Sequence, residues 1–595
     1  MASVVPQGVL MGNEGLDPRN SLSEPQQEMQ MTDAGVYQTD INNQPLEVYM
    51  YYAAIERERE DNDPRPVPDA PWTVLFKKLT GKGHTVITGD ENDTAVASIH
   101  NEKALEHEKD GDRFSNEKGH HDTLGTKGDR DLAYRLLRTA SWQAVFYLIT
   151  TDILGFSSAP ESFQELGYGP GVLVYTCFFL LAVGAGQIIY RLYLALDSEK
   201  YPVKCYADLG ERTFGKIVRH IFNVVQSLQL LFNVALLIIG NGQTLASIIE
   251  FKFCYIALNV FFAILGGVGG QIRSLRNFAW FANINIWLNI LVMIMTMVGI
   301  AKYAPVPGES GHTSLADPIQ TSGWVPSYTQ GWYQQVSGVQ LAVFAYGGAM
   351  IFTEFMAEMR RPKDFWKAAF VAQTFCYLMY MFFGIFCYAF QGQYSSILPS
   401  LDFANQSLSL GANIIGLVST AVAAVLYANI GVKVLYENVL RAYFNAPELV
   451  TTRGRIYWST SVIVYWALAW VIGSAIPNIT ALVTLVGAAC ILQFTYTFPP
   501  ILLLGHWMQR DAMKADQPWA PGMAPGSNRV DTWRDASRWK RGFAPYWYYK
   551  VVLMLLFLGA LALAGLGIYS GIETAIVAYA ASTTTAFSCI APGQT

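Results

Sequence analysis

Long apolar stretches alternate with short polar ones along most of the chain, from about residue 135 onward. The stretch from Val551 to Tyr569 has no charged residue and is long enough to cross a hydrocarbon core of roughly 30 Å as a helix. Residues 221–249 are also uncharged and long enough to cross with some tilt. Eleven stretches are therefore predicted to be membrane-spanning helices, numbered here spans 1 to 11, at approximately 139–167, 171–192, 220–249, 253–271, 278–301, 335–359, 367–390, 412–440, 457–476, 479–504 and 547–570.

The charges between the spans predict their orientation. Lys and Arg collect in the cytosolic loops of membrane proteins. If the N-terminus lies in the cytosol, the cytosolic loops contain 21 Lys and Arg residues, whereas the exoplasmic loops contain only Lys252 and Lys302. One span more or fewer would destroy this alternation. The sequence thus predicts eleven spans, a cytosolic N-terminus and an exoplasmic C-terminus.

Residues 1–130 differ in composition from the rest of the chain. They carry a net charge of −11, whereas the remainder carries +6, and they have no sustained hydrophobic period. We expect a mostly disordered cytosolic tail without a cleaved signal peptide. For residues 48–60, VYMYYAAIERERE, a short helix docked on a partner is one alternative, and a solvated segment is favoured. The transmembrane domain is expected at residues 135–575, followed by a short exoplasmic tail, 576–595.

Two spans are interrupted near their middles. Span 1 contains GFSSAP, residues 155–160, and span 6 contains FAYGGAM, residues 344–350. Irregular backbone within a membrane is stable only where it is buried in protein or lines a cavity. Each interruption opens a block of five spans, and because five is odd, the second block is inverted relative to the first. Such a pair indicates a secondary transporter that binds its substrate at the breaks; glycines that merely allow close helix packing are the alternative.

An unwound segment exposes backbone groups that suit an amino acid. N–H groups at the start of the second half-helix favour a carboxylate, and C=O groups at the end of the first favour an ammonium. The N–H groups of residues 155–157 are predicted to be free for this role, and Ser158-Ala-Pro-Glu161 has the pattern of a capping box. The predicted substrate site consists of Gly155, Phe156, Ser157, Ser158, Phe344, Ala345, Tyr346, Gly347 and Gly348.

Two long motifs resemble signatures of the amino acid/auxin permease family. TDILGFSSAPESFQELGYGPGV is similar to the glycine-broken first span of that family, and VFAYGGAMIFTEFMAEMRRPKDFWKA is similar to its span-6 signature. The resemblance covers about residues 135–575 and is nearest to fungal neutral amino-acid permeases of the N-system, or methyltryptophan-resistance, type. It implies an all-α polytopic membrane protein of eleven helices, with a LeuT-like five-plus-five inverted repeat and cation-coupled amino-acid transport. Many relatives have a small residue in place of Asp152, so the resemblance assigns no ion-coupling role to that position.

Two acidic residues lie within the broken spans. Asp152 is beside the break in span 1, where a carboxylate costs on the order of 2.5–3.5 kcal/mol and is expected to face the protein interior or a cavity. It is a candidate to take up a proton outside and release it inside; a carboxylate that only braces the unwound backbone is an equal alternative. Glu354, past the break in span 6, is a candidate for gating or proton coupling, with a structural role slightly favoured.

Polar residues of the other spans extend this picture. Ser419 and Thr420 in span 8 offer hydroxyls to a possible cation site, which leaves sodium coupling open. Gln226, Gln229 and Asn233 share one face of span 3. Such a stripe either lines a pathway or hydrogen-bonds to neighbouring helices, and the second interpretation is favoured.

The function predicted from these features is secondary active import of neutral aliphatic and aromatic amino acids by proton symport. Phe156, Phe344 and Tyr346 flank the breaks, and no partner for a cationic substrate side chain is evident. A sodium-coupled or vacuolar transporter is an alternative, as is an amino-acid-sensing receptor on the same fold. The sequence has no phosphate-binding loop and no nucleophile with a base in a span, which argues against an ATP-driven pump and an enzyme. We expect a plasma-membrane protein with no cofactor, metal site or nucleic-acid partner, whose N-terminal tail is free to bind cytosolic proteins.

Cysteines and one sequon complete the expectations. The seven cysteines are far apart, form no CxxC pair and mostly fall within spans, so neither a disulfide framework nor a zinc site is predicted. Asn405-Gln-Ser407 lies in an exoplasmic loop and is a predicted glycosylation site.

Overall fold

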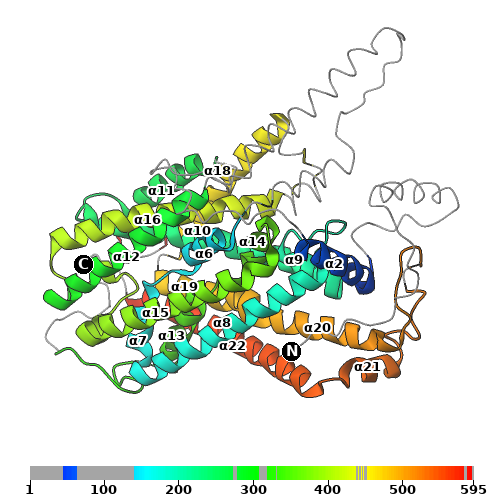
Figure 1. Cartoon of the computed structure of the whole chain (residues 1–595). Helices are drawn as coiled ribbons and strands as arrows, with labels where there is room; N and C mark the ends of the chain where they lie inside the picture. The colour runs from blue at the N-terminus through cyan, green and yellow to red at the C-terminus, as the bar shows by residue number, and fades with distance from the viewer. Residues whose placement is uncertain are drawn as a thin grey trace, which may run out of the picture. The chain divides into compact units, whose positions relative to one another are not determined.

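The protein is described by a computed structural model that places residues 44–62, 138, 140–271, 278–306, 318–329, 331–436, 440, 444, 446–447, 452–476, 478–524, 526–581 and 586–591. Within these residues the regular structure is helical (Figure 1). The longer helices are α2 (Leu46–Asp61), α6 (Trp142–Ile153), α7 (Ser158–Leu166), α8 (Tyr168–Leu196), α9 (Tyr206–Phe214), α10 (Lys216–Ile248), α11 (Tyr255–Gly269), α12 (Phe278–Lys302), α13 (Trp332–Ala345), α14 (Phe352–Glu358), α15 (Phe365–Gln391), α16 (Gln406–Leu435), α18 (Thr452–Ala475), α19 (Ile479–Val486), α20 (Phe498–Ala512), α21 (Ala536–Phe543) and α22 (Trp547–Ala581).

Nine helical segments of the described residues are long and apolar enough to cross a membrane. The apolar helix α11 is shorter, and span 1 consists of the two short helices α6 and α7. A helix satisfies its own backbone hydrogen bonds, which is what an apolar segment in lipid requires. The chain is therefore an all-helical polytopic membrane protein, and every stretch predicted as a span coincides in sequence with a helix or a pair of helices.

The broken helices pack against each other and against long unbroken ones. The half-helix α7 lies against α13, and α6 lies against α15 and α12. Helix α10 contacts α16, α18 and α11, which run beside it in Figure 1. Helix α22 packs against α19 and α13. The two halves of span 1 and of span 6 are thus enclosed by other helices, as irregular backbone in a membrane must be.

Helix α2 departs from the expectation of a solvated segment. Residues 46–61 form a helix whose one face, including Leu46, Tyr49 and Ala53, is buried. It lies against α8 and α9 (Figure 1), and its charged side chains meet basic and acidic partners there. The favoured interpretation of this stretch was therefore wrong. Partners distant in the sequence bury Tyr49 and bind Glu47, Arg57 and Glu60, which composition alone does not reveal.

A disulfide also departs from expectation. Cys254, at the start of α11, is bonded to Cys589 in the C-terminal segment, with their Cα atoms 4.4 Å apart. The backbone N–H of Tyr255 donates to the Cys589 carbonyl, so the two segments are paired along the chain as well. The prediction of no disulfide was wrong for this pair because 335 residues separate the two cysteines, and spacing patterns report only nearby ones.

Helix α22 also continues to Ala581, beyond the predicted end of span 11.

Candidate functional site

Span 1 is broken where the sequence predicts. Helix α6 ends at Ile153 and α7 begins at Ser158, so residues 154–157 lie between the two half-helices. The Gly155 N–H donates to the Ile153 carbonyl at 2.5 Å, which corrects the prediction that this group is free. The N–H groups of Phe156 and Ser157 have no backbone acceptor in the described part of the chain. Two donors therefore remain unused at this break.

The predicted capping box of α7 does not form. Ser158 is the first residue of the helix rather than its cap, and its hydroxyl donates to the Gly155 carbonyl at 3.3 Å. Glu161 accepts a hydrogen bond from the Thr480 hydroxyl of α19 at 2.8 Å. Because the acidic side chain has a partner on another helix, it fixes α7 to α19 instead of capping its own helix.

Span 6 is broken at the predicted glycines. Helix α13 ends at Ala345, residues 346–348 form turns, and a short 3-10 turn, η3 (Ala349–Ile351), leads into α14. The N–H of Gly347 donates to the Phe344 carbonyl at 3.1 Å, and that of Gly348 donates to the Tyr346 carbonyl at 3.0 Å. The donors of this break are therefore occupied, in contrast to those of Phe156 and Ser157.

The two breaks meet. A Cβ atom added to Gly348 would lie 2.6 Å from the Asp152 carboxylate and 2.6 Å from Cγ1 of Ile153. Real Cβ atoms do not approach other atoms so closely, so only glycine permits this contact. The Tyr380 hydroxyl of α15 lies between the two breaks and bonds the carbonyls of Ile153 and Ala345, the latter at 2.8 Å. One tyrosine thus holds the last carbonyls of α6 and α13 together.

Asp152 lies at this meeting point. The Tyr427 hydroxyl of α16 donates to its backbone carbonyl at 2.9 Å. Its side-chain Oδ2 is buried and has no hydrogen-bond partner among the described residues. A buried carboxylate oxygen without a partner is unfavourable as a bare charge, so it needs a proton or a positively charged ligand.

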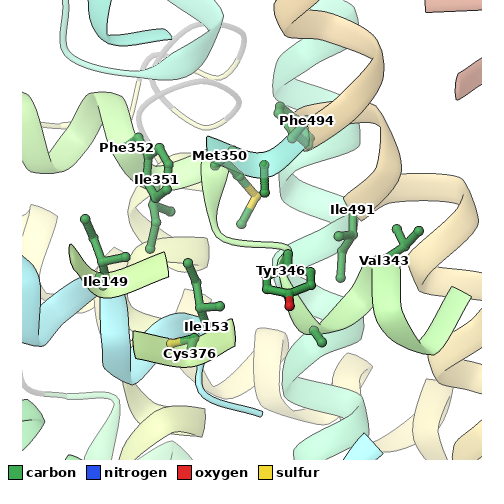
Figure 2. Close-up of a cluster of buried hydrophobic side chains, with 14 of the residues drawn as sticks. Ile149, Ile153, Val343, Tyr346, Met350, Ile351, Phe352, Cys376, Ile491 and Phe494 are labelled. Atoms are coloured by element: carbon green, nitrogen blue, oxygen red, sulfur yellow. The ribbon is translucent and has the colours of Figure 1, made fainter. Parts of the chain in front are cut away.

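The walls around the breaks are aromatic and aliphatic. The Tyr346 ring lies edge-on to Tyr380, with ring centroids 5.3 Å apart, and Tyr175 lies 6.0 Å away. Figure 2 shows Ile153, Met350 and Ile491 around Tyr346. The Tyr346 hydroxyl is buried without a hydrogen-bond partner in the part of the chain described here. The Tyr175 hydroxyl is likewise buried without a partner among the described residues, so the walls can enclose an apolar group and offer it phenol hydroxyls.

Phe156 and Phe344, which were expected to flank a substrate, have different surroundings. Phe156 packs edge-on against Phe383 of α15, with centroids 5.1 Å apart. Phe344 is partly buried, and its Cβ lies 3.9 Å from the position of a Cβ on Gly487. The Phe156 ring thus packs on α15, whereas the Cβ of Phe344 lies near span 10.

Span 10 contributes an irregular wall that the sequence did not indicate. Two π-helical turns, Gly487–Ile491 and Gln493–Thr497, interrupt it between α19 and α20. A Cβ on Gly347 would lie 2.4 Å from Cγ2 of Ile491. Wide turns of this kind are frequent at functional sites, and here one lies directly against the span-6 break.

Glu354 is held by two hydrogen bonds. Its carboxylate accepts from the Gln226 side chain of α10 at 3.0 Å and from the Thr353 hydroxyl at 2.7 Å. Gln226, Gln229 and Asn233 are all buried. For Gln226 the structure favours the interpretation of a hydrogen bond to a neighbouring helix.

Ser419 and Thr420 bond to two different helices. The Ser419 hydroxyl donates to Asn289 of α12, and the Thr420 hydroxyl donates to Asn241 of α10. Thr420 precedes Tyr427 by seven residues, which is about 10 Å along a helix axis. Both hydroxyls are engaged by asparagines of neighbouring helices, and a cation site there stays a prediction.

The structure thus brings together the central members of the predicted site: Asp152, Ala345, Tyr346, Gly347 and Gly348. It adds Tyr380, Tyr427 and Ile491, which sequence analysis missed because aromatic and aliphatic residues are common in every span.

The described residues contain no group of three His, Cys, Asp or Glu side chains arranged to hold a metal ion. Asn405 caps α16 through its side-chain oxygen, which accepts from the Leu408 N–H at 2.9 Å, and its glycosylation stays a prediction.

Comparison with known proteins gives a consistent picture. Residues 138–515 match the family model described as transmembrane amino acid transporter protein. The chain is 26% identical over 367 residues to the N amino acid transport system protein of Neurospora crassa, an alignment that covers 60% of this chain and 74% of that protein. It is 24% identical over 388 residues to a transmembrane transporter of Gibberella moniliformis, covering 62% and 76%. It is 23% identical over 399 residues to the lysine histidine transporter-like 3 protein of Arabidopsis thaliana, covering 62% and 81%.

Proposed function

This chain belongs to the transmembrane amino acid transporter family, and on that premise we propose that it imports neutral aliphatic and aromatic amino acids by proton symport. The observation that carries the proposal is the contact between the two broken spans, where Gly348 lies against Asp152 and Tyr380 joins the two breaks. The free N–H groups of Phe156 and Ser157 suit the substrate carboxylate. The unpartnered Asp152 oxygen is a candidate for the ammonium group or for the coupled proton.

Neutral substrates are favoured by the walls of this site. Apart from Asp152, the described side chains that surround the breaks are aromatic, aliphatic, hydroxyl-bearing or sulfur-containing, as Met350 and Cys376 are (Figure 2). A cationic substrate side chain would require a second carboxylate close by, and Glu354 is engaged by Gln226 and Thr353. A desolvated charge without a partner costs several kcal/mol, so charged side chains are disfavoured.

Proton coupling rests on Asp152, with Glu354 as a second candidate. Intramembrane carboxylates are often proton carriers, and Asp152 has an oxygen that no described donor satisfies. A carboxylate that only braces the unwound backbone stays the equal alternative, and Tyr427 binds this residue through its backbone carbonyl. Ser419 and Thr420 keep sodium coupling as the alternative, although their hydroxyls are directed at Asn289 and Asn241.

The proposed architecture has eleven spans with a five-plus-five inverted repeat, a cytosolic N-terminus and an exoplasmic C-terminus. The Cys254–Cys589 disulfide supports it in two ways. Eight proposed spans separate the two cysteines, and an even number returns the chain to the same side. Structural disulfides form in oxidising compartments, which fits an exoplasmic position for both cysteines. We place the protein in the plasma membrane, with the vacuolar membrane as the alternative.

One uptake assay tests the proposal. Permease-deficient cells expressing the full chain are given labelled leucine, phenylalanine, tryptophan or lysine at acidic and neutral pH, with and without sodium. We expect uptake of the three neutral amino acids, faster at acidic pH and independent of sodium. Lysine preference or a strict sodium requirement would overturn the proposal, and signalling without uptake would identify a receptor on this fold.

A further inference from the structure

Helix α2 contacts other segments of the chain at both of its ends. At its N-terminal end, Glu47 forms a two-pronged ion pair with Arg529 in the segment between α20 and α21, at 3.1 and 3.0 Å. The Tyr51 ring lies edge-on to Trp519 of the same segment, with centroids 5.5 Å apart. This end of α2 is therefore fixed to the connection between spans 10 and 11.

The other end of α2 is fixed to the ends of the broken spans. Arg57 donates to the buried carboxylate of Asp197, at the end of α8, at 3.2 Å. Arg138, just before α6, donates to the same carboxylate at 3.3 Å. Lys363, which follows α14, donates through its backbone N–H to Glu60 at 3.1 Å and through its side chain to the Arg57 carbonyl at 3.0 Å.

Burial between these ends makes the contact more than a surface ion pair. Tyr49 is 2% exposed, packs edge-on against Tyr201 at 5.3 Å and lies under the Arg212 guanidinium at 4.6 Å. Burial raises the pKa of Glu60, and the charges of Arg57 and Lys363 oppose that shift. An acidic, aromatic helix is thus matched to a basic surface of the same chain.

The elements that α2 joins lie at the end of the molecule where the two half-helices α6 and α14 are paired, so that this end is closed. The Ala140 N–H donates to the Glu358 carbonyl and the Arg360 N–H to the Ala140 carbonyl, both at 3.0 Å, so the outer ends of α6 and α14 are paired. A substrate at the breaks that leaves toward this end must pass between these half-helices and their neighbours. Helix α2, which has 16 residues and is about 24 Å long, links these half-helices to the segment between spans 10 and 11.

We propose that α2 is a latch that holds the cytosolic ends of spans 1 and 6 to the connection between spans 10 and 11, and so limits opening of the site toward the cytosol. The proposal rests on the proposed function, which places this side in the cytosol. Opening requires α2 to release one of its ends, and the Glu47–Arg529 pair is the ion pair that holds its N-terminal end. Anything that detaches α2 therefore accelerates transport.

Charge reversal in the full chain tests the latch. Glu47→Lys and Arg529→Glu each place like charges together, and the double variant restores an opposite pair in reverse order. We expect each single variant to raise the initial rate of uptake about fivefold and the double variant to return it to the wild-type rate. Arg59→Glu on the same helix is the control, because the Arg59–Glu199 pair is exposed and is expected to leave the rate unchanged. Single variants with unchanged or lower uptake, or a double variant that is not restored, overturn the latch.

Cysteine labelling follows the docking itself. Ala53 is buried in the docked helix and Ala54 is exposed, so Ala53→Cys reports release and Ala54→Cys serves as its matched control. A membrane-impermeant maleimide is added to inside-out vesicles, and the label is quantified on the proteolytic peptide that contains residues 53 and 54. We expect the cysteine at position 53 to be modified about fivefold faster in the Glu47→Lys background than in the wild-type background. The cysteine at position 54 should be modified at the same rate in both backgrounds. Equal rates at 53 in both backgrounds overturn the proposal. The labelling experiment needs no substrate. If the wild-type chain takes up none of the tested amino acids, the proposed function is wrong, but the labelling experiment still tests whether α2 is released.

Discussion

Spans 1 and 6 are both broken at glycines, but the glycines have different surroundings. At the span-6 break, a Cβ on Gly348 would strike Asp152 and Ile153, and a Cβ on Gly347 would strike Ile491. At the span-1 break, the nearest atom to a Cβ on Gly155 is the Ile153 carbonyl oxygen at 3.8 Å, an ordinary contact. Glycine is therefore required in span 6 by close approach, whereas in span 1 the space beside it is open.

The hydrogen bonds of the two breaks differ in the same direction. In span 6 the Gly347 and Gly348 N–H groups are used within the turn, and in span 1 those of Phe156 and Ser157 are not. Span 6 thus resembles a packed hinge that closes on span 1, and span 1 resembles the part that offers backbone donors. Substitutions at the two breaks are therefore expected to have unequal effects on packing and on substrate binding.

The largest effect is expected from Gly348→Ala. The new methyl group would lie 2.6 Å from Asp152 and Ile153, so the two breaks must separate. Overpacking of this kind costs about 1–3 kcal/mol, and we expect uptake to fall by about tenfold or more. Labelled leucine uptake, normalised to the amount of protein in the membrane, is the measurement. Wild-type uptake by this variant would show that the contact between the breaks is not needed.

Asp152→Asn separates a proton carrier from a brace. If Asp152 must bind a proton before inward movement, wild-type uptake rises as the outside pH falls, and the variant loses that rise because asparagine does not titrate. We then expect the ratio of uptake at acidic and neutral pH to drop to about one, and accumulation against a gradient to disappear. Asn keeps the backbone carbonyl that Tyr427 binds, so the fold is preserved. A variant with undiminished pH dependence would leave Asp152 only the bracing role.

The breaks and the spans were predictable because their causes are local in the sequence. Uncharged stretches of sufficient length have few options other than a membrane helix, and the GFSSAP and FAYGGAM segments interrupt such stretches. Their contact was also foreseeable in outline, since two interrupted spans at corresponding positions predict a substrate site formed by both breaks.

What could not be predicted depends on partners far along the chain. Tyr380 and Tyr427 look like any aromatic residue of a span, and only the fold places their hydroxyls on backbone carbonyls of the breaks. The helix α2 reads as a solvated acidic segment until Arg212, Arg529 and their neighbours are brought beside it. The Cys254–Cys589 bond joins residues whose proximity has no signature in spacing.

An intermediate effect is expected from Tyr380→Phe, which acts on both breaks at once. The change removes the hydroxyl hydrogen that the Ile153 and Ala345 carbonyls share, and although the Ile153 carbonyl keeps the Gly155 N–H, the buried Ala345 carbonyl loses this donor. We expect a loss of stability of about 1–3 kcal/mol, seen as a lower melting temperature of the purified protein. Tyr377→Phe on the same helix is the matched control, because the Tyr377 hydroxyl bonds the Thr176 hydroxyl of α8 instead of the Ile153 and Ala345 carbonyls. Equal melting temperatures for the two variants would argue against a bridging role for Tyr380.

The smallest effect on the fold is expected from Gly155→Ala, the counterpart of Gly348→Ala. Its methyl group meets nothing closer than 3.8 Å, and alanine restricts the unfolded chain, so stability should change by less than about 1 kcal/mol. Since Gly155 lies beside the unused donors, any loss of transport should appear in the KM for amino acids and not in the melting temperature. A melting temperature lowered as far as that of Gly348→Ala would mean that span 1 is as tightly packed at its break as span 6. An unchanged melting temperature with a raised KM would instead indicate that the open space beside Gly155 is occupied by the substrate.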